Sequence, residues 1–292
     1  MKPCVLALGF FDGVHLGHGA LLRRTREVAD EKHLTAAALT FDTHPDTLVR
    51  GERIALLNTP EERTQLMQEL YGIDEVRTLH FDRETMQQPW QDFVRDTLRD
   101  TYNAAYVVCG EDFRFGARGE GTPEKLRTEC EKYGIGCDCI AQVKLEGETV
   151  SSTCIRTLLQ TGETKKAVRF LGHPHLLSGT VISGQRLGRT LGIPTANFEI
   201  ADGVLTPKFG VYAADAVLDS GRYRAVVNIG TRPTVHGKTV TVEPWILDFD
   251  GDLYGKTIQL ELLDFLRPER KFDSLEELKA EILRNAEMAR NM

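Results

Sequence analysis

Short apolar runs alternate with helical patterns along the first half of the chain. Runs typical of buried strands cover residues 4–10, 35–41 and 104–109, and apolar positions at helical spacing cover residues 20–31, 60–71 and 123–133. Strands that alternate with helices in this way are typical of βαβ units, in which crossover helices join parallel strands. The pattern predicts an α/β domain built on an open parallel sheet, with a Rossmann-like fold.

The pattern changes after residue 172, where extended runs separated by turns take over. Antiparallel strands in a small domain favour closure into a barrel, because closure leaves no exposed sheet edge. A last helix is expected after Ser274, with Glu277 completing a capping box and Leu275, Leu278 and Ile282 on one apolar face. A chain of 292 residues also favours two domains. We expect domains at 1–172 and 173–292, the second a six-stranded antiparallel β-barrel with a C-terminal helix. Its runs cover residues 177–182, 195–200, 211–218, 223–229, 239–249 and 257–265.

Charge and cysteine usage narrow the functional classes. Lys and Arg total 36 against 43 Asp and Glu, a net charge of −7, which gives no general attraction for nucleic acid. No run approaches the roughly 20 apolar residues of a membrane span, so we expect a soluble protein. Six scattered cysteines without a secretory leader fit a reducing cytoplasm. Cys130, Cys137 and Cys139 could be zinc ligands, but no paired CxxC motif accompanies them and ordinary thiols are expected. The oligomeric state is left open.

Two histidines stand in a glycine-rich segment, residues 9–18 (GFFDGVHLGH), where the first expected strand passes into a helix. Backbone amides and the helix dipole favour phosphate at such a junction. His15 and His18 can donate to the oxygens that gain charge when pyrophosphate leaves a nucleotide. Gly9, Gly13 and Gly17 would let the backbone approach a ligand closely. The alternative is a pair of histidines that only cap or solvate the turn, but the whole segment favours a nucleotide-transfer site.

Residues 110–116 (GEDFRFG) follow another expected strand, at the carboxyl end where open α/β sheets bind ligands. Phe113 and Phe115 could flank a flat ring while Arg114 or Arg118 meets phosphate, or both phenylalanines could simply return to the core. Residues 40–45 (TFDTHP) end a further strand at the same rim and carry a weaker signal.

Residues 151–156 (SSTCIR) open a short helix with hydroxyls at its cap and Arg156 in its first turn. This arrangement suits an anion, and a guanidinium can grip two oxygens of a leaving pyrophosphate. The alternative is a capped helix with an exposed arginine.

A basic, glycine-interrupted loop at residues 184–192 (GQRLGRTLG) leads directly into residues 193–197 (IPTAN). The backbone amides of such a loop can wrap phosphates. Thr195 and Asn197 lie two apart on an expected strand, so both face one side and could hold magnesium beside those phosphates. Without the Pro-Thr-Ala-Asn continuation, a hairpin turn would be the better interpretation.

Glu243 is an acid within an apolar strand. Burying a charge there costs free energy unless the carboxylate has hydrogen-bond partners or a function. It could take the proton from an attacking hydroxyl in phosphoryl transfer, or point to solvent from an edge strand. Strand alternation puts it on one face with Trp245 and Leu247, but Pro244 could mark a bulge, so the pattern does not decide which face that is.

Taken in order, these segments closely resemble the bacterial bifunctional riboflavin kinase and FMN adenylyltransferase family, also called FAD synthetase, over nearly the whole chain. Residues 9–18 and residues 192–197 are the most specific of these segments in combination. The segments are residues 9–18, 112–116, 151–156, 192–197, 228–230 (NIG) and 252–255 (DLYG).

The resemblance implies an amino-terminal nucleotidyltransferase domain that makes FAD from FMN and ATP, and a carboxy-terminal barrel that makes FMN from riboflavin and ATP, both with magnesium. His15 and His18 would stabilise adenylyl transfer, helped by Arg156, and Glu243 would activate the ribityl hydroxyl. Thr195 and Asn197 would hold magnesium. ATP and its phosphates would be bound by Gly9, Phe10, Asp12, Gly17, Ser152, Arg156, Gly184, Arg189, Gly192 and Thr195, and the flavin by Asp112, Phe113, Arg114 and Asn228.

Four positions depart from the family's usual pattern. Glu243 is followed by Pro244 and Trp245 in place of a small or polar residue and a histidine, Val235 stands where phenylalanine is usual, and Glu111 adds a negative charge before the Asp-Phe-Arg-Phe-Gly motif. We expect altered affinity and retained activity.

Two other functions fit parts of this pattern. The first domain could transfer an adenylyl or cytidylyl group to another phosphorylated acceptor, because the His-Leu-Gly-His feature recognises the nucleotide and not the acceptor. Alternatively, the chain could bind flavin without turnover. The presence of Glu243, a base that a pure binder does not need, speaks against the second alternative.

Overall fold

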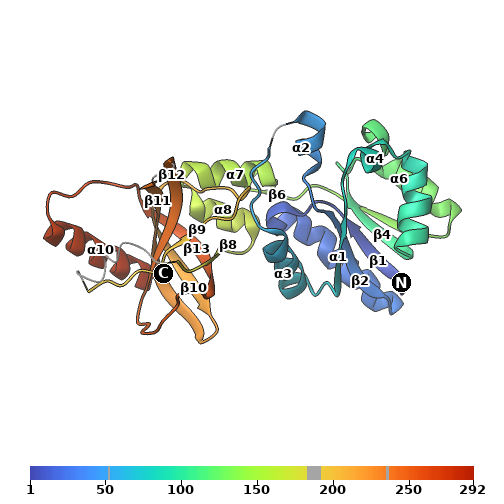
Figure 1. Ribbon diagram of the computed structural model, residues 1–292. Coiled ribbons are helices and arrows are strands. Elements are labelled where there is room, and N and C mark those ends of the chain that lie inside the picture. The colour runs from blue at the N-terminus through green and yellow to red at the C-terminus, as the bar shows by residue number, and fades with distance from the viewer. Residues whose placement is uncertain (52, 183–191, 235–236) are drawn as a thin grey trace. The chain divides into compact units, whose positions relative to one another are not determined.

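The computed structural model describes residues 1–51, 53–182, 192–234 and 237–292. The chain divides into two compact units, Met1–Ser152 and Thr153–Met292 (Figure 1), and each has its own sheet and core. None of the helices in the described ranges combines the length and the apolar character that a membrane crossing needs.

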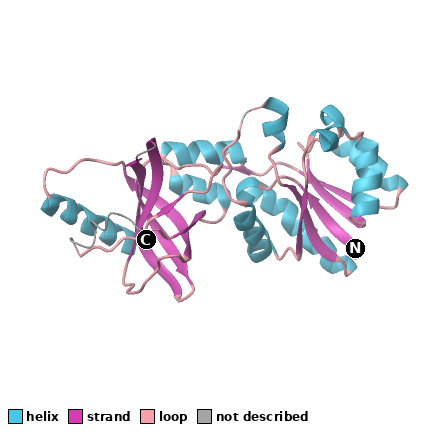
Figure 2. Ribbon diagram, viewed as in Figure 1, coloured by secondary structure: helices cyan, strands magenta, loops and turns pink. Residues whose placement is uncertain are grey.

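The first unit is a five-stranded parallel sheet in the order β3-β2-β1-β4-β5. Helices cover both of its faces, as Figure 2 shows, so the predicted Rossmann-like α/β sheet is confirmed. The strands are β1 Cys4–Leu8, β2 Thr35–Phe41, β3 Glu75–Leu79, β4 Ala104–Gly110 and β5 Gly136–Ile140. The helices are α1 Leu16–Lys32, α2 Pro45–Arg50, α3 Pro60–Tyr71, α4 Arg83–Gln87, α5 Trp90–Asp92, the π-helical η2 Phe93–Thr101 and α6 Pro123–Lys132. Two 3-10 turns are η1 Asp12–Val14 and η3 Ala117–Gly119. A small hairpin consists of β6 Lys144–Leu145 and β7 Glu148–Thr149.

The three central strands of this sheet are fully or largely buried, which explains their apolar sequences. β1 is buried at every position, and β2 at every position but its two ends. Strands covered on both faces carry near-continuous apolar runs and do not alternate. The sheet order reverses beside β1, between β1 and β4, so the carboxyl ends of these two strands flank the switch point where open α/β sheets bind ligands.

The second unit is a six-stranded antiparallel sheet in the order β8-β13-β10-β11-β12-β9. Its two edge strands meet, because the Ile182 N–H donates to the Asn197 carbonyl (2.7 Å) and Gly179 lies against the Phe198 ring. The predicted barrel is therefore confirmed. The elements are α7 Ser152–Thr161, α8 Thr164–Leu171, β8 His175–Thr180, β9 Phe198–Glu199, β10 Gly210–Leu218, β11 Gly221–Thr234, β12 Gly237–Ile246, β13 Thr257–Arg267 and α10 Leu275–Arg290.

The C-terminal helix lies on the outside of the barrel. The Ser274 hydroxyl accepts a hydrogen bond from the Glu277 N–H (3.1 Å), as the sequence predicted, and α10 begins there. The Glu277 carboxylate accepts from the Asp273 N–H (3.3 Å) and not from the Ser274 N–H, so the predicted capping box is only half formed. Ala286 and Ala289 pack on the outer faces of β10 and β11, around Ala213 and Val226. Small residues let the helix approach the strands closely at this end. Toward its N-terminal half the helix carries larger side chains.

Helices α7 and α8 precede the barrel and pack with it. The Leu159 carbonyl of α7 accepts from the Lys208 N–H (3.0 Å), and α8 lies against β13 and β8. The compact units consequently divide between Ser152 and Thr153. The sequence places the functional boundary after Gly172, between α8 and β8, and that division stays a prediction.

Candidate active sites

The segment between β1 and α1 has an unusual backbone. Phe11 and Val14 adopt left-handed φ angles of 59° and 41°, and Gly13 one of 79°. Left-handed non-glycine residues cost energy and cluster at functional sites. His15 then caps α1: its Nδ1 accepts a hydrogen bond from the His18 backbone N–H (3.3 Å). That bond uses the Nδ1 lone pair, so neutral His15 carries its ring proton on Nε2.

The two imidazoles form a stacked pair. Their ring centroids lie 3.6 Å apart with an interplanar angle of 14°, and Phe11 meets the His18 ring edge-on at 5.3 Å. Burial of the ring, then the nearby His15 and Arg63, hold the pKa of His18 well below its usual value. His18 is therefore neutral at pH 7. Its buried Nδ1 has no hydrogen-bond partner among the described residues, so the pair retains unused capacity for a polar ligand.

Arg63 stabilises the turn around His15 and His18 through hydrogen bonds to the backbone. The motifs in the sequence did not indicate this role of Arg63. Its guanidinium donates to the carbonyls of Phe10 (2.9 Å) and Phe41 (3.1 Å) and lies 4.4 Å from the Phe10 ring centroid. A capping box places it: Thr59 and Glu62 exchange side-chain and backbone hydrogen bonds at the start of α3. The signal in the sequence is Thr-Pro-Glu-Glu-Arg, a helix start with an arginine in its first turn.

Asp12 and Ser152 connect motifs that are 140 residues apart in the chain. The Ser152 hydroxyl donates to the Asp12 carbonyl (2.9 Å), and the Asp12 carboxylate accepts from the Leu57 N–H (2.8 Å). Asp12 is only 2% exposed. The structure therefore brings the start of the SSTCIR motif to the histidine turn, and it uses the Asp12 side chain to hold that turn.

The TFDTHP segment also reaches the histidine turn. His44 meets the Phe10 ring edge-on with centroids 4.6 Å apart, and the Thr40 hydroxyl donates to the Phe10 carbonyl (2.9 Å). Gly9 and Gly17 are half-buried beside the turn, and a Cβ on Gly17 would come within 3.0 Å of the His15 ring. A side chain at position 17 would therefore press on the histidine pair.

The 110–116 segment presents its charges outward and its rings inward. Asp112 and Arg114 are exposed, whereas Phe115 is buried and Phe113 packs against the same core cluster. The two phenylalanine rings stack on one another with centroids 5.4 Å apart. A flat ligand between two rings needs about 7 Å, twice the usual contact distance. The rings therefore do not sandwich a ligand in this structure, and only an outer face of the pair remains for one.

Arg156 lies in the first turn of α7 and is half-buried. By its contacts this part of α7 belongs to the second compact unit. That Arg156 works together with His15 and His18 stays a prediction.

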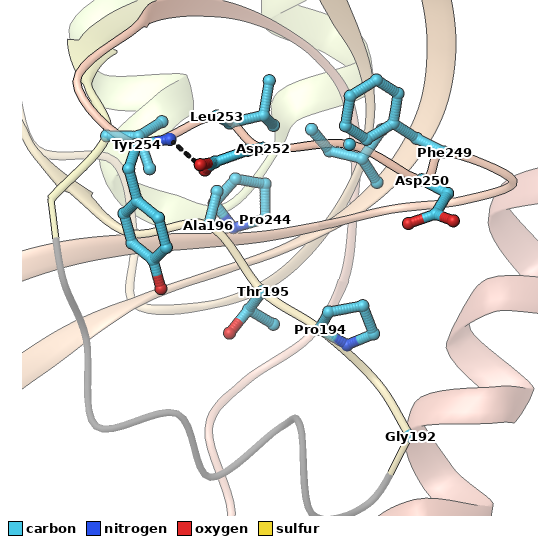
Figure 3. A pocket seen from close by; sticks show the side chains of 13 residues that line it. Gly192, Pro194, Thr195, Ala196, Pro244, Phe249, Asp250, Asp252, Leu253 and Tyr254 are labelled. Atoms are coloured by element: carbon cyan, nitrogen blue, oxygen red, sulfur yellow. Dashed lines mark hydrogen bonds between the residues drawn. The ribbon is translucent and has the colours of Figure 1, made fainter.

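A cavity of about 710 Å³ opens at one end of the barrel (Figure 3). One wall is the Pro194-Thr195-Ala196 segment, and the opposite wall is the 249–254 loop. The Tyr254 N–H donates to the Asp252 carboxylate (3.0 Å), and Val181 holds Gly255 and Lys256 through two backbone hydrogen bonds of 2.9 Å. The loop and the Pro-Thr-Ala-Asn segment therefore frame one site, large enough for a nucleotide. Its lining also includes Gly192, Pro244, Ile246, Phe249, Asp250, Gly251 and Leu253.

A second cavity, of about 390 Å³, lies between the outer face of the barrel and α10. Glu243 lines it and is half-buried, and its Oε1 accepts from the Thr241 hydroxyl (3.3 Å). Asn228 stands directly opposite Glu243 in the ladder of β11 and β12. Much of the remaining lining is apolar and aromatic, as suits a flat organic ligand. It consists of Ile193, Thr195, Val211, Val226, Trp245, Arg267, Glu269, Arg270, Phe272, Leu278, Ile282 and Asn285.

Pro244 does not make a bulge. The pairing of β12 with β11 runs without a shift past Val227 opposite Pro244 and Asn228 opposite Glu243. The Pro244 carbonyl accepts from Ala196 (3.0 Å), so its missing N–H faces the short β9 side and removes no bond to β11. Pro244 consequently lines the larger cavity, while Glu243 and Trp245 line the smaller one from the opposite face.

Among the described residues that line the two cavities, Thr195 is common to both. Asn197, two residues on, is 9% exposed, and its side-chain amide lies 3.5 Å from the Thr195 carbonyl. Both residues precede β9, which is shorter than the strand predicted at 195–200. Gly192 lines the larger cavity, whereas Gly184, Arg189 and Val235 lie outside the described residues.

Within the described ranges, no group of three or more His, Cys, Asp or Glu side chains is arranged to hold a metal ion. The hydroxyl of Thr195 and the amide oxygen of Asn197 are hard oxygen donors that suit magnesium, which is commonly bound by a few protein groups together with substrate phosphates. The six cysteines are free thiols, and Cys130 is fully buried in the core of the first unit.

A Rossmann-like unit with paired histidines at a strand-to-helix turn, and a barrel with a nucleotide-sized cavity beside an acid, define a nucleotide-dependent transferase. The profile of the FAD synthetase family matches residues 1–154, and that of riboflavin kinase matches residues 171–292.

Individual proteins of known sequence give the same family as the two profiles. The chain is 38% identical over 291 residues to the bifunctional riboflavin kinase/FMN adenylyltransferase of Escherichia coli K12, covering 99% of this chain and 92% of that protein. Its identity to the protein of the same name from Haemophilus influenzae is 34%, covering 99% and 94%. A crystal structure from Streptococcus pneumoniae, described as a macrolide-efflux protein, superposes with a TM-score of 0.89 at 31% identity, covering 100% and 95%.

The chain belongs to the bifunctional riboflavin kinase/FMN adenylyltransferase family, which confirms the resemblance drawn from the motifs. It is a transferase that uses ATP to convert riboflavin to FMN and FMN to FAD.

Proposed function

We propose that the two reactions take place at two separate ATP sites, one at the histidine turn and one in the barrel. Adenylyl transfer to FMN uses the turn around His15 and His18, and phosphorylation of riboflavin uses the two connected cavities of the barrel. The observation that carries the second assignment is that Thr195 lines both the nucleotide-sized cavity and the cavity that contains Glu243.

In the first site, a phosphate oxygen of FMN attacks the α-phosphorus of ATP. The bond between the α-phosphorus and the oxygen that bridges it to the β-phosphorus breaks, and pyrophosphate leaves. His15 donates from Nε2, and the neutral His18 ring adds a second polar contact where negative charge gathers. Gly9, Phe10 and Gly17 let the backbone approach the phosphates, while Ser152 and Arg156 hold them. Asp12 acts through the turn that it stabilises.

For FMN in this site we propose the exposed rim of the 110–116 segment. Asp112 and Arg114 are exposed there and can contact a polar or phosphorylated ligand. The flavin ring packs on an outer face of the Phe113 and Phe115 stack, in place of the sandwich that the sequence alone permitted.

In the second site, ATP lies in the larger cavity and riboflavin in the smaller one. Glu243 accepts the proton of the terminal ribityl hydroxyl, whose oxygen attacks the γ-phosphorus while ADP leaves. Asn228, opposite Glu243, orients the ribityl chain. Thr195 stands between the two cavities, where the γ-phosphate meets the hydroxyl. Gly184, Arg189 and Gly192 belong to the loop proposed to wrap the phosphates.

Magnesium fits the oxygen donors of Thr195 and Asn197, and when bound it neutralises phosphate charge at that position. We propose no nucleic-acid or membrane partner, and the free thiols support a reducing compartment such as the cytoplasm.

A time course tests the proposed function. The purified chain is incubated with riboflavin, ATP and magnesium, and the flavins are separated chromatographically. We expect FMN to rise first and FAD to follow, with one ADP and one pyrophosphate released per FAD. Accumulation of FMN without FAD would indicate a different adenylyl acceptor, and tight riboflavin binding without any product would indicate a binding protein.

A further inference from the structure

The floor of the smaller cavity is a row of four neighbouring residues across four strands. Arg267 pairs with Val211, Val211 with Asn228, and Asn228 with Glu243. The polar groups that the proposed kinase reaction uses, Asn228 and Glu243, stand at one end of this row. The ribityl chain of a bound riboflavin therefore lies at that end, and its ring system must extend elsewhere in the cavity.

Helix α10 forms the roof of the same cavity. Leu278, Ile282 and Asn285 line it from successive turns of one helix face. They span about 10 Å along the helix axis, a length that a three-ring system can fill. Immediately after Asn285, Ala286 packs directly on the strands. Asn285 therefore marks the closed end of the cavity.

The Asn285 side chain is buried and incompletely satisfied. The residue is 1% exposed, and its amide nitrogen has no hydrogen-bond partner among the described residues. Buried donors without an acceptor are rare in proteins because burial removes their water. A donor of this kind that lines a ligand cavity is explained if the ligand supplies the acceptor.

Two arginines that line the same side of the cavity, Arg267 and Arg270, form ion pairs with Glu281. Arg267 lies 3.3 Å from the Glu281 carboxylate and Arg270 lies 3.4 Å from it. Both arginines also contact the Phe272 ring. These contacts fix the position of both arginines in the cavity wall, although Arg267 Nε, like the Asn285 amide nitrogen, has no hydrogen-bond partner among the described residues. Of these two donors, the Asn285 amide belongs to the uncharged side chain at the closed end of the cavity.

We propose that Asn285 is a specificity-determining residue of the flavin site, and that its side-chain amide donates a hydrogen bond to a ring carbonyl of riboflavin. Isoalloxazine carries two carbonyl oxygens on one outer ring and only methyl groups on the other, so a single donor at the closed end selects which end of the ring enters first. This inference rests on the proposed placement of riboflavin in the smaller cavity.

The test replaces Asn285 with leucine, which has a similar volume and no donor, and measures riboflavin affinity by quenching of flavin fluorescence. We expect the Kd to rise about tenfold, the effect of one lost hydrogen bond. The thermal midpoint of the barrel should stay equal or rise, because the substitution also removes an unsatisfied polar group. A residue with a purely structural role would lower the midpoint and the affinity together. Glu287→Gln, an exposed position on the same helix, is the matched control and should change neither quantity.

Two analogues identify the contact. In 2-thioriboflavin and 4-thioriboflavin, sulfur, a weak acceptor, replaces one carbonyl oxygen. The wild-type chain should bind one of them several-fold more weakly than riboflavin, and Asn285→Leu should bind that analogue and riboflavin equally. Asn285→Met gives a second variant that lacks a donor, and it should also bind riboflavin more weakly.

The outcomes separate the two levels of the proposal. If both variants keep the wild-type Kd, or if the preference for riboflavin over the thio analogue persists in them, Asn285 does not recognise a ring carbonyl. Trp245 lines the smaller cavity. If bound riboflavin leaves the fluorescence of Trp245 in the wild-type chain unchanged, the placement of the substrate is wrong. Adenylylation of supplied FMN should be the same in all variants.

Discussion

His175 illustrates how one buried side chain sets the acid stability of the barrel. It is 1% exposed, and burial, with a smaller effect of His173, lowers its pKa from 6.5 to about 3. The folded chain keeps this ring neutral, whereas the unfolded chain protonates it below pH 6.5. The stabilisation is therefore complete above pH 6.5 and is lost as the pH falls toward 3.

We predict that the barrel loses roughly 2 kcal/mol of unfolding free energy between pH 7 and pH 5 through His175 alone. Denaturant unfolding followed by Trp245 fluorescence in a Trp90→Phe background measures it, because each unit contains one of the two tryptophans. In His175→Gln this part of the pH dependence should disappear. An equally steep acid loss in that variant would assign the effect to other groups.

Sequence motifs identify candidate catalytic residues better than they identify the residues whose role depends on three-dimensional contacts. His15, His18 and Glu243 follow from residue type and spacing. Arg63 and Asn285 do not, because their importance depends on burial and on which partners they have or lack in three dimensions. The phenylalanine pair shows the reverse case: spacing suggested a sandwich, and packing placed the rings against each other.

At the scale of elements, glycine at position 179 allows the barrel to close. A Cβ there would lie 2.2 Å from the Phe198 ring, and Phe198 is fully buried. We predict that Gly179→Ala destabilises the barrel by about 1–3 kcal/mol, the usual cost of overpacking. Chemical denaturation monitored through Trp245 measures this loss. Ser178→Ala on the same strand is the control, and an alanine at 179 that costs no more than the control would contradict this account of closure.

Edge strands explain most of what the hydrophobic pattern did not predict. β3 and β5 stand at the two edges of the parallel sheet, where neither is fully buried at any position, so neither needs a continuous apolar run. The start of α1 also lies earlier than its apolar spacing indicates, at Leu16. The His15 cap, and not hydrophobicity, determines that start.

At the scale of the whole molecule, the sequence predicted both architectures, because each has its own hydrophobic period. It did not predict that α7 and α8 pack with the barrel, since an amphipathic helix shows that it has a buried face without showing which sheet covers it. The central claim is that the two reactions use separate sites, so that FMN made in the barrel is used at the histidine turn.

Paired lesions test this claim most directly. Glu243→Gln should lower FMN formation from riboflavin by roughly 10²–10⁴-fold and leave FAD formation from supplied FMN unchanged. His18→Ala should lower FAD formation by roughly 10²–10³-fold and leave FMN formation unchanged. A mixture of the two variants should convert riboflavin to FAD. If either substitution, in a folded chain, abolished both reactions, the account of two separate sites would be wrong.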